Sequence, residues 1–124
     1  MSQSINIGGS VTLVNNQLRT VISLADNFNT TGSNSISSNE NVPTGSWVSV
    51  DQGSNSDFRY GFFSNLDATS SIYLAIGSAS TSSYSAFLQP GDVAIIPNYG
   101  TTPIFAKATG SNSPAILQYL LTEK

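Results

Sequence analysis

Residues 71–77 read SIYLAIG, and the rest of the chain can be interpreted outward from them. Every second position from residue 72 holds isoleucine or leucine, whereas Tyr73 and Ala75 occupy the positions between, which is the period of a half-buried β-strand. A polar segment follows, and residues 84–97 then read YSAFLQPGDVAIIP. Because Pro90-Gly91 matches the central pair of a type II turn, these residues predict a β-hairpin.

Similar short apolar segments recur along the chain at about the 8–12-residue spacing of an all-β domain. They cover residues 10–14, 18–25, 46–51, 58–63, 104–109 and 115–123. Further turns are expected at Asn15–Gln17, Gln52–Ser56 and Gly110–Pro114, where polar residues, Gly and Pro gather. The last apolar segment also fits a short helix that begins after Pro114, but its length and the β-pattern before it favour a strand.

We therefore expect an all-β fold: one antiparallel β-sandwich or jelly-roll-like domain over residues 1–124, with about eight to ten strands. Alternation within the segments predicts which side chains fill the core. The predicted core is Leu13, Ile22, Leu24, Val48, Val50, Ile72, Leu74, Ile76, Leu88, Ile95, Ile104 and Leu120.

The composition excludes several functions. The 124 residues include no cysteine and no histidine, which excludes disulfides, thiolate catalysis, Zn–thiolate sites and Ser-His-Asp machinery. Seven Asp and Glu residues remain, most of them at expected turns or strand ends, where Asp caps a turn through the backbone. We therefore predict a protein that is not an enzyme, with no catalytic, cofactor-binding or metal-binding residues.

Charge and hydropathy limit the partners. Lys and Arg supply 4 residues and the net charge is −3, so no basic surface for nucleic acid is expected. No apolar run approaches the roughly 20 residues of a membrane span. The first residues lack the basic and apolar parts of a signal peptide, so we expect synthesis in the cytoplasm without export.

Two segments stand apart from the strand pattern. Residues 26–45 contain three large apolar residues without a clear period, and we expect a long flexible loop there. Three interpretations stay open for it: a mobile surface excursion, an arm that orders on a partner, and an unrecognised edge strand. Residues 1–9 are expected to form an N-terminal arm. The residues expected to anchor these arms on a partner are Ile5, Ile7, Phe28, Ile36 and Val42.

Two motifs have a structural and a functional interpretation. Residues 51–57 (DQGSNSD) resemble a calcium loop, but the third position is Gly53 and the sixth is Ser56, so a polar hairpin loop is favoured. Aromatic residues gather between Trp47 and Phe63. Such side chains can stack on sugars, but in strands they more often fill a core.

The second half carries a resemblance to a known group of proteins. It is seen in residues 65–77 (NLDATSSIYLAIG), 87–92 (FLQPGD), 103–110 (PIFAKATG) and 117–123 (LQYLLTE). These segments resemble small β-rich virion proteins of tailed bacteriophages, which serve as auxiliary (decoration) subunits, head fibres or adaptors. The resemblance covers about 60 residues and rests on the positions of the turn residues between the strands of the expected hairpins. Proteins of this group act through their surfaces, so the resemblance assigns no site residues to this chain.

The resemblance implies a non-enzymatic structural component of a bacteriophage virion. The expected role is an auxiliary or decoration capsid protein that binds the major capsid protein or another head component. A homo-oligomer is expected, with a trimer favoured. The few charges agree with a subunit packed among neighbours, since free proteins carry more charge to suppress association. The alternative is a carbohydrate- or receptor-binding module of a tail appendage, which exposed aromatic residues in a groove would favour.

Overall fold

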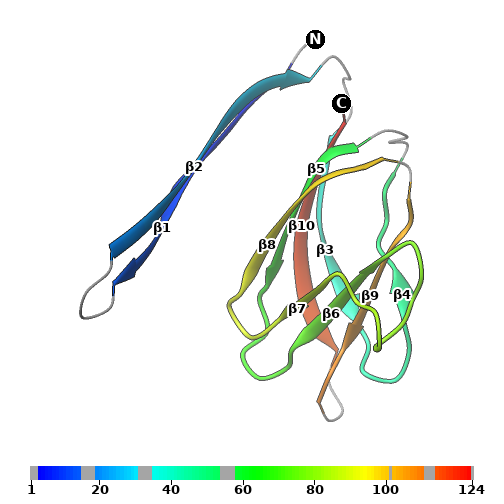
Figure 1. Cartoon of the computed structure of the whole chain (residues 1–124). Coiled ribbons are helices and arrows are strands. Elements are labelled where there is room, and N and C mark those ends of the chain that lie inside the picture. Colours follow the sequence, from blue (N-terminus) through cyan, green and yellow to red (C-terminus); the bar gives the residue numbers. More distant parts are fainter. Residues whose placement is uncertain are drawn as a thin grey trace. The chain divides into compact units, whose positions relative to one another are not determined.

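The computed structural model describes residues 3–14, 19–30, 35–53, 58–100, 102–110 and 114–123, and within these ranges all regular structure is β (Figure 1). The chain divides into two compact units, Met1–Ser33 and Asn34–Lys124. In the same described ranges, no helix is long and apolar enough to cross a membrane. The strands are β1 (Gln3–Val14), β2 (Arg19–Thr30), β3 (Ser35–Val42), β4 (Val48–Ser49), β5 (Phe58–Asn65), β6 (Ile72–Ile76), β7 (Ala86–Leu88), β8 (Val93–Gly100), β9 (Ile104–Ala108) and β10 (Ala115–Glu123).

The first unit is a long β-hairpin. Strands β1 and β2 pair antiparallel over twelve residues each, from Gln3↔Thr30 to Val14↔Arg19. This confirms the hairpin predicted around residues 15–17, which themselves lie outside the described residues. Its strands are longer than predicted, because β1 begins at Gln3, within the expected N-terminal arm, and β2 continues to Thr30.

The second unit is a sandwich of two four-stranded antiparallel sheets, in the orders β3-β10-β5-β8 and β4-β9-β6-β7. Four of the antiparallel pairs are nested in the sequence, with each pair enclosed by the one before it: β3–β10, β4–β9, β5–β8 and β6–β7. This nesting is the strand arrangement of a jelly roll. The predicted antiparallel β-sandwich is therefore confirmed.

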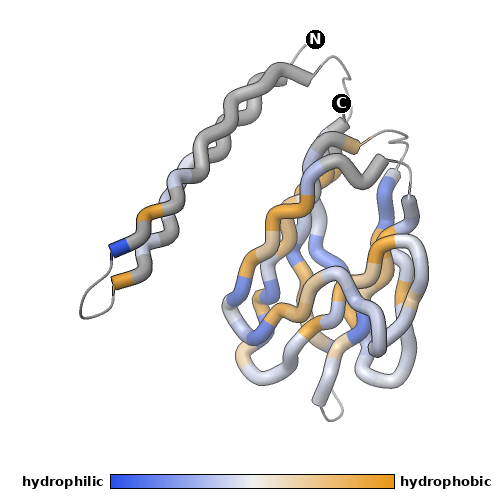
Figure 2. Tube along the Cα trace, viewed as in Figure 1, coloured by the Kyte–Doolittle hydropathy of each residue, from blue (hydrophilic) through white to orange (hydrophobic). Residues whose placement is uncertain are grey.

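The core lies between the two sheets, and hydrophobic residues run along strands such as β5 and β8 (Figure 2). Of the predicted core residues, Val50, Ile72, Leu74, Leu88 and Ile104 are buried, and Val48 and Ile76 pack against them. The side chains of Leu13, Ile22 and Leu24 lie outside the described residues. The largest fully buried side chains also include Tyr119, Phe58, Phe63, Leu117, Leu121 and Val42.

Two core predictions are wrong. Ile95 is 43% exposed, and its neighbour Ile96 packs against the core instead. Leu120 is half-buried, whereas Leu121 on the same strand is fully buried. In both strands apolar residues occupy both faces, so alternation alone does not show which face meets the second sheet.

The loop expected over residues 26–45 is also largely strand. Residues 26–30 end β2, and Ser35–Val42 forms β3, the edge strand of the first sheet. Of the three interpretations, the edge strand is therefore the one that the structure confirms for residues 35–42. An edge strand tolerates polar residues on both faces because less of its surface is buried, which is why its pattern resembled a loop.

Two local interactions hold the connections between the sheets. Gly91 has φ +85°, and the Asp92 amide donates to the Gln89 carbonyl at 2.9 Å, which confirms the predicted type II turn. Asn65, at the end of β5, is fully buried, and its side-chain amide donates to the carbonyls of Ser70 (2.8 Å) and Leu88 (3.1 Å). Because Leu88 lies in the second sheet, this side chain links the two layers.

Candidate functional surfaces

The outer face of the first sheet carries apolar residues that the sandwich does not cover. The register aligns Ile95, Phe62 and Leu120 in one row across β8, β5 and β10, and the row ends at Ser37 on β3. Val93, on the next outward position of β8, is 71% exposed. We call Phe62, Val93, Ile95 and Leu120 the apolar patch. It lies on three neighbouring strands, and the polar strand β3 borders it.

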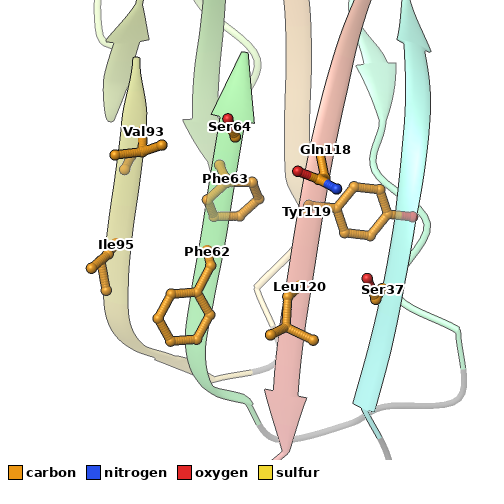
Figure 3. A pocket seen from close by; sticks show the side chains of 10 residues that line it. Ser37, Phe62, Phe63, Ser64, Val93, Ile95, Gln118, Tyr119 and Leu120 are labelled. Carbon is orange, nitrogen blue, oxygen red and sulfur yellow. The ribbon is translucent and has the colours of Figure 1, made fainter. Parts of the chain in front are cut away.

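An open pocket with a volume of about 400 Å³ lies over this patch (Figure 3). Val93 and Ile95 border it on β8, Phe62 on β5, and Gln118 and Leu120 on β10. The remaining lining residues are Ser37, Phe63, Ser64, Ala94 and Tyr119. The pocket therefore offers apolar contact together with hydroxyl and amide groups.

No carboxylate or amine occurs among these described lining residues, so the pocket is suited to binding by contact and hydrogen bonds. Its titratable group is Tyr119, and burial raises the pKa of this phenol above its ordinary value of 10.0. The hydroxyl donates to the Asp51 carbonyl at 3.0 Å. Tyr119 therefore serves to anchor the loop after β4.

The outer face of the second sheet carries a cluster of aromatic rings. Tyr73 on β6 lies at its centre, with ring centroids 4.6 Å from Phe87, 5.0 Å from Tyr84 and 6.4 Å from Trp47. We call these four residues the aromatic cluster. The rings are tilted by 45–60° to one another, as edge-to-face contacts favour. Tyr84 is 46% exposed and Phe87 37%, so two of the rings remain partly open to solvent.

The surroundings of the aromatic cluster are polar with little charge. Lys107 lies opposite Tyr73 in the β6–β9 ladder and is the one charged residue in the strands of this sheet. Residues 78–83, which precede Tyr84, are Ser-Ala-Ser-Thr-Ser-Ser. Aromatic faces beside hydroxyl groups can stack on the apolar face of a sugar ring and bind its hydroxyls.

Three of the described acidic residues, Asp51, Asp67 and Asp92, hold turns through their side chains, as predicted. Asp51 accepts from the Gly53 amide at 2.8 Å, and Asp92 accepts from the Gln89 amide at 2.9 Å. Asp67 accepts from the amides of Thr69 (3.0 Å) and Ser70 (2.6 Å), and these bonds lower its pKa from 3.8. Among the described residues, no three acidic side chains gather as a metal site would require. Most of the calcium-like segment, residues 54–57, lies outside them.

The structure separates the predicted anchor residues into two groups. Val42 is fully buried in the sandwich core, so it is not available to a partner while the sandwich is folded, and Ile36 is half-buried and packs against the core. Ile5 and Phe28 are direct partners in the β1–β2 ladder, and Ile7 pairs with Asp26. The two segments expected to act as separate arms therefore meet within one hairpin. The side chains of Ile5, Ile7 and Phe28 lie outside the described residues.

The aromatic stretch between Trp47 and Phe63 is also divided. Phe58 and Phe63 are buried in the core, whereas Phe62 lies in the apolar patch and Trp47 in the aromatic cluster. Sequence reasoning missed the aromatic cluster, although Tyr73 was correctly assigned to the face opposite Ile72 and Leu74. Its members come from distant parts of the chain, and only the pairing of β6 with β7 and β9 brings them together.

Comparisons with models of protein families, with curated proteins and with solved structures found no match for this chain.

Proposed function

We propose that this protein is a non-enzymatic structural component of a bacteriophage virion, an auxiliary or decoration protein that binds the major capsid protein. The observation that carries the proposal is the apolar patch on the outer face of the first sheet. Val93 and Ile95 are 71% and 43% exposed there, beside half-buried Phe62 and Leu120. Contiguous exposed apolar surface often marks a protein–protein contact.

The small number of charged residues supports the same proposal. Charged residues make up 9% of the chain, against about 25% in an average domain. A free protein with so few charges associates readily, whereas a subunit built into a particle needs less protection from association. The apolar patch with its border of Ser37 and Gln118 fits a protein interface with an apolar centre and a polar rim.

The fold adds an argument by analogy only. Jelly rolls are common in viral capsid domains, and they are also found in lectins. Because one fold hosts many functions, this analogy supports the proposed function but does not identify the residues that bind. The resemblance of residues 65–123 to small phage virion proteins, described above, supports the same direction.

The proposal is tested by adding the protein to purified particles that lack it. Ile95→Asp places a charge in the apolar patch and should weaken binding by about tenfold or more, because the carboxylate must lose its water. Tyr84→Ser, on the outer face of the other sheet, is the matched control and should bind as the wild type does. Absence of the wild-type chain from purified virions by mass spectrometry, or undiminished binding by Ile95→Asp, contradicts the proposal.

The aromatic cluster favours a second candidate function, binding of a carbohydrate as part of a phage tail appendage. Tyr84 and Phe87 expose apolar ring surface, and hydroxyl-bearing residues precede them in the chain. Rings in such surroundings provide the stacking and hydrogen bonds that saccharides need.

The carbohydrate alternative has a convenient probe, because Trp47 is the sole tryptophan and belongs to the aromatic cluster. Titration with host cell-surface polysaccharide should change its fluorescence if the cluster binds sugar. Phe87→Ala should abolish the change and Val93→Ala, in the apolar patch, should leave it intact. No fluorescence change with the wild type, or equal responses from both variants, contradicts this function.

A further inference from the structure

The β1–β2 register divides the hairpin into two unlike faces. Successive residues of a strand lie on opposite faces, and cross-strand partners share a face. Starting from the pair Gln3↔Thr30, one face holds every second pair of the ladder. The residues on this first face are Gln3, Ile5, Ile7, Gly9, Val11, Leu13, Thr20, Ile22, Leu24, Asp26, Phe28 and Thr30.

The second face is polar by comparison. Its residues are Ser4, Asn6, Gly8, Ser10, Thr12, Val14, Arg19, Val21, Ser23, Ala25, Asn27 and Asn29. Seven large apolar residues lie on the first face, namely Ile5, Ile7, Val11, Leu13, Ile22, Leu24 and Phe28, against two valines on the second. The hairpin is therefore an amphipathic ribbon, which is the pattern of a sheet with one covered face.

Within the first unit, the described residues form two strands only, with neither a third strand nor a second layer. A two-stranded hairpin is marginally stable in water by itself, and it needs further strands or a packed hydrophobic face to persist. A ribbon with seven large apolar residues on one face must therefore find cover for them.

The area of this face is sufficient for an interface between copies. Burying one large aliphatic or aromatic side chain removes roughly 60–120 Å² from water, so seven remove roughly 400–800 Å² per copy. Two such faces together give roughly 800–1,600 Å², and a specific interface needs about 1,000 Å² or more. The face is also self-complementary, because it is apolar along most of its length and carries one charged residue, Asp26.

We infer that the apolar face of the β1–β2 hairpin is a self-association surface, covered by the same face of another copy of this chain. The sheets pack face to face across the interface as the two layers of a sandwich do. Since one charge lies on the face, the association is driven by apolar burial, and it depends little on salt. This inference goes beyond the proposed function and holds whether or not the protein is part of a virion.

The experiment compares adjacent residues of β2 that lie on opposite faces. Sedimentation of the whole chain over a range of concentrations gives the number of copies and the dissociation constant. Ile22→Asp, on the apolar face, should raise that constant by about tenfold or more, because it places a carboxylate in a dry interface. Ser23→Asp, the matched control on the polar face, should leave it within about twofold of the wild type.

Several results would overturn the inference. These are a wild-type monomer at all concentrations, equal effects of Ile22→Asp and Ser23→Asp, or a loss of association of about tenfold between 50 and 500 mM salt. Thermal unfolding of both variants shows whether the sandwich stays folded. Should Ile22→Asp fail to fold, Leu13→Ser with Thr12→Asp as its control repeats the test on β1, with the same expected and contradicting outcomes.

Discussion

The hairpin and the sandwich solve the same problem of one-sided sheets in different ways. In the sandwich, each sheet covers the other, and residues such as Leu74 and Leu121 are fully buried between them. In the hairpin, an equally regular alternation places Ile22 and Leu24 on one face, but the described residues of this unit form no second layer. The comparison teaches that the second unit is complete within one chain, whereas the first needs a further surface to bury its apolar face.

The largest effect is expected from removing a core side chain of the sandwich. Leu121 is fully buried, so Leu121→Ala should destabilise the sandwich by about 2–5 kcal/mol through lost burial and the cavity left behind. Leu120 is the next residue along the strand and is half-buried on the outer face, so Leu120→Ala should lower the stability clearly less. Chemical denaturation measures both, and equal losses would mean that the two faces of β10 are assigned wrongly.

Removing the Asn65 side chain should have the next largest effect. Its amide bonds to Ser70 and Leu88, and its oxygen accepts from the Asp67 amide at 3.0 Å. Asn65→Ala removes these three hydrogen bonds and should lower the free energy of unfolding, measured with denaturant, by about 1–3 kcal/mol. Thr69→Ala, in the exposed part of the same connection, is the control. A neutral Asn65→Ala would show that the layers hold together without this link.

A smaller effect is expected at the type II turn between β7 and β8. An added Cβ at Gly91 meets nothing within 4 Å, so the expected cost comes from the positive φ alone. Gly91→Val should lower stability by roughly 1–2 kcal/mol, and Gly91→Asn by less, because asparagine tolerates this conformation. Equal melting temperatures for Gly91→Val and the wild type would exclude a left-handed residue at this position.

The smallest effect concerns Asp67, which is half-buried. The amides of Ser70 and Thr69 hold the pKa of its carboxyl below 3.8, so the ionised form favours the folded state. The sign follows from linkage: the contribution is fully present above pH 3.8 and is lost as the pH falls through the lower folded value. Asp67→Asn should flatten the stability profile in this acid range only. NMR titration of Asp67 at or above 3.8 would contradict the assignment.

The sequence predicted the sandwich wherever one face of a strand was clearly more apolar than the other. Residues 71–77 and the Pro90-Gly91 turn are confirmed, because alternation and turn chemistry are local properties. The prediction was wrong at Ile95 and Leu120, where apolar residues occupy both faces. For the residues of β3 it favoured a loop and left an edge strand as one of three interpretations, since an edge strand with Ser and Asn residues lacks a buried period.

The two candidate surfaces show the same limit. Phe62 was noticed as part of an aromatic stretch, but its neighbours Ile95 and Leu120 belong to other strands. Register brings such residues together, and register is decided by the pairing of the whole sheet. The pairing of Ile5 with Phe28 also depends on register. The predicted turn at residues 15–17 implied that two strands pair there, but the alternation did not reveal how far along the chain the pairing extends.

The contrast between the two units is tested most directly by amide hydrogen exchange of the whole chain at two protein concentrations. If copies cover the apolar face of the hairpin, protection of the β1 and β2 amides should rise with concentration, since association stabilises by mass action. Protection of core amides in β6 and β10 should remain unchanged. Hairpin protection that is the same at both concentrations would contradict the account, because the face would then need no second copy.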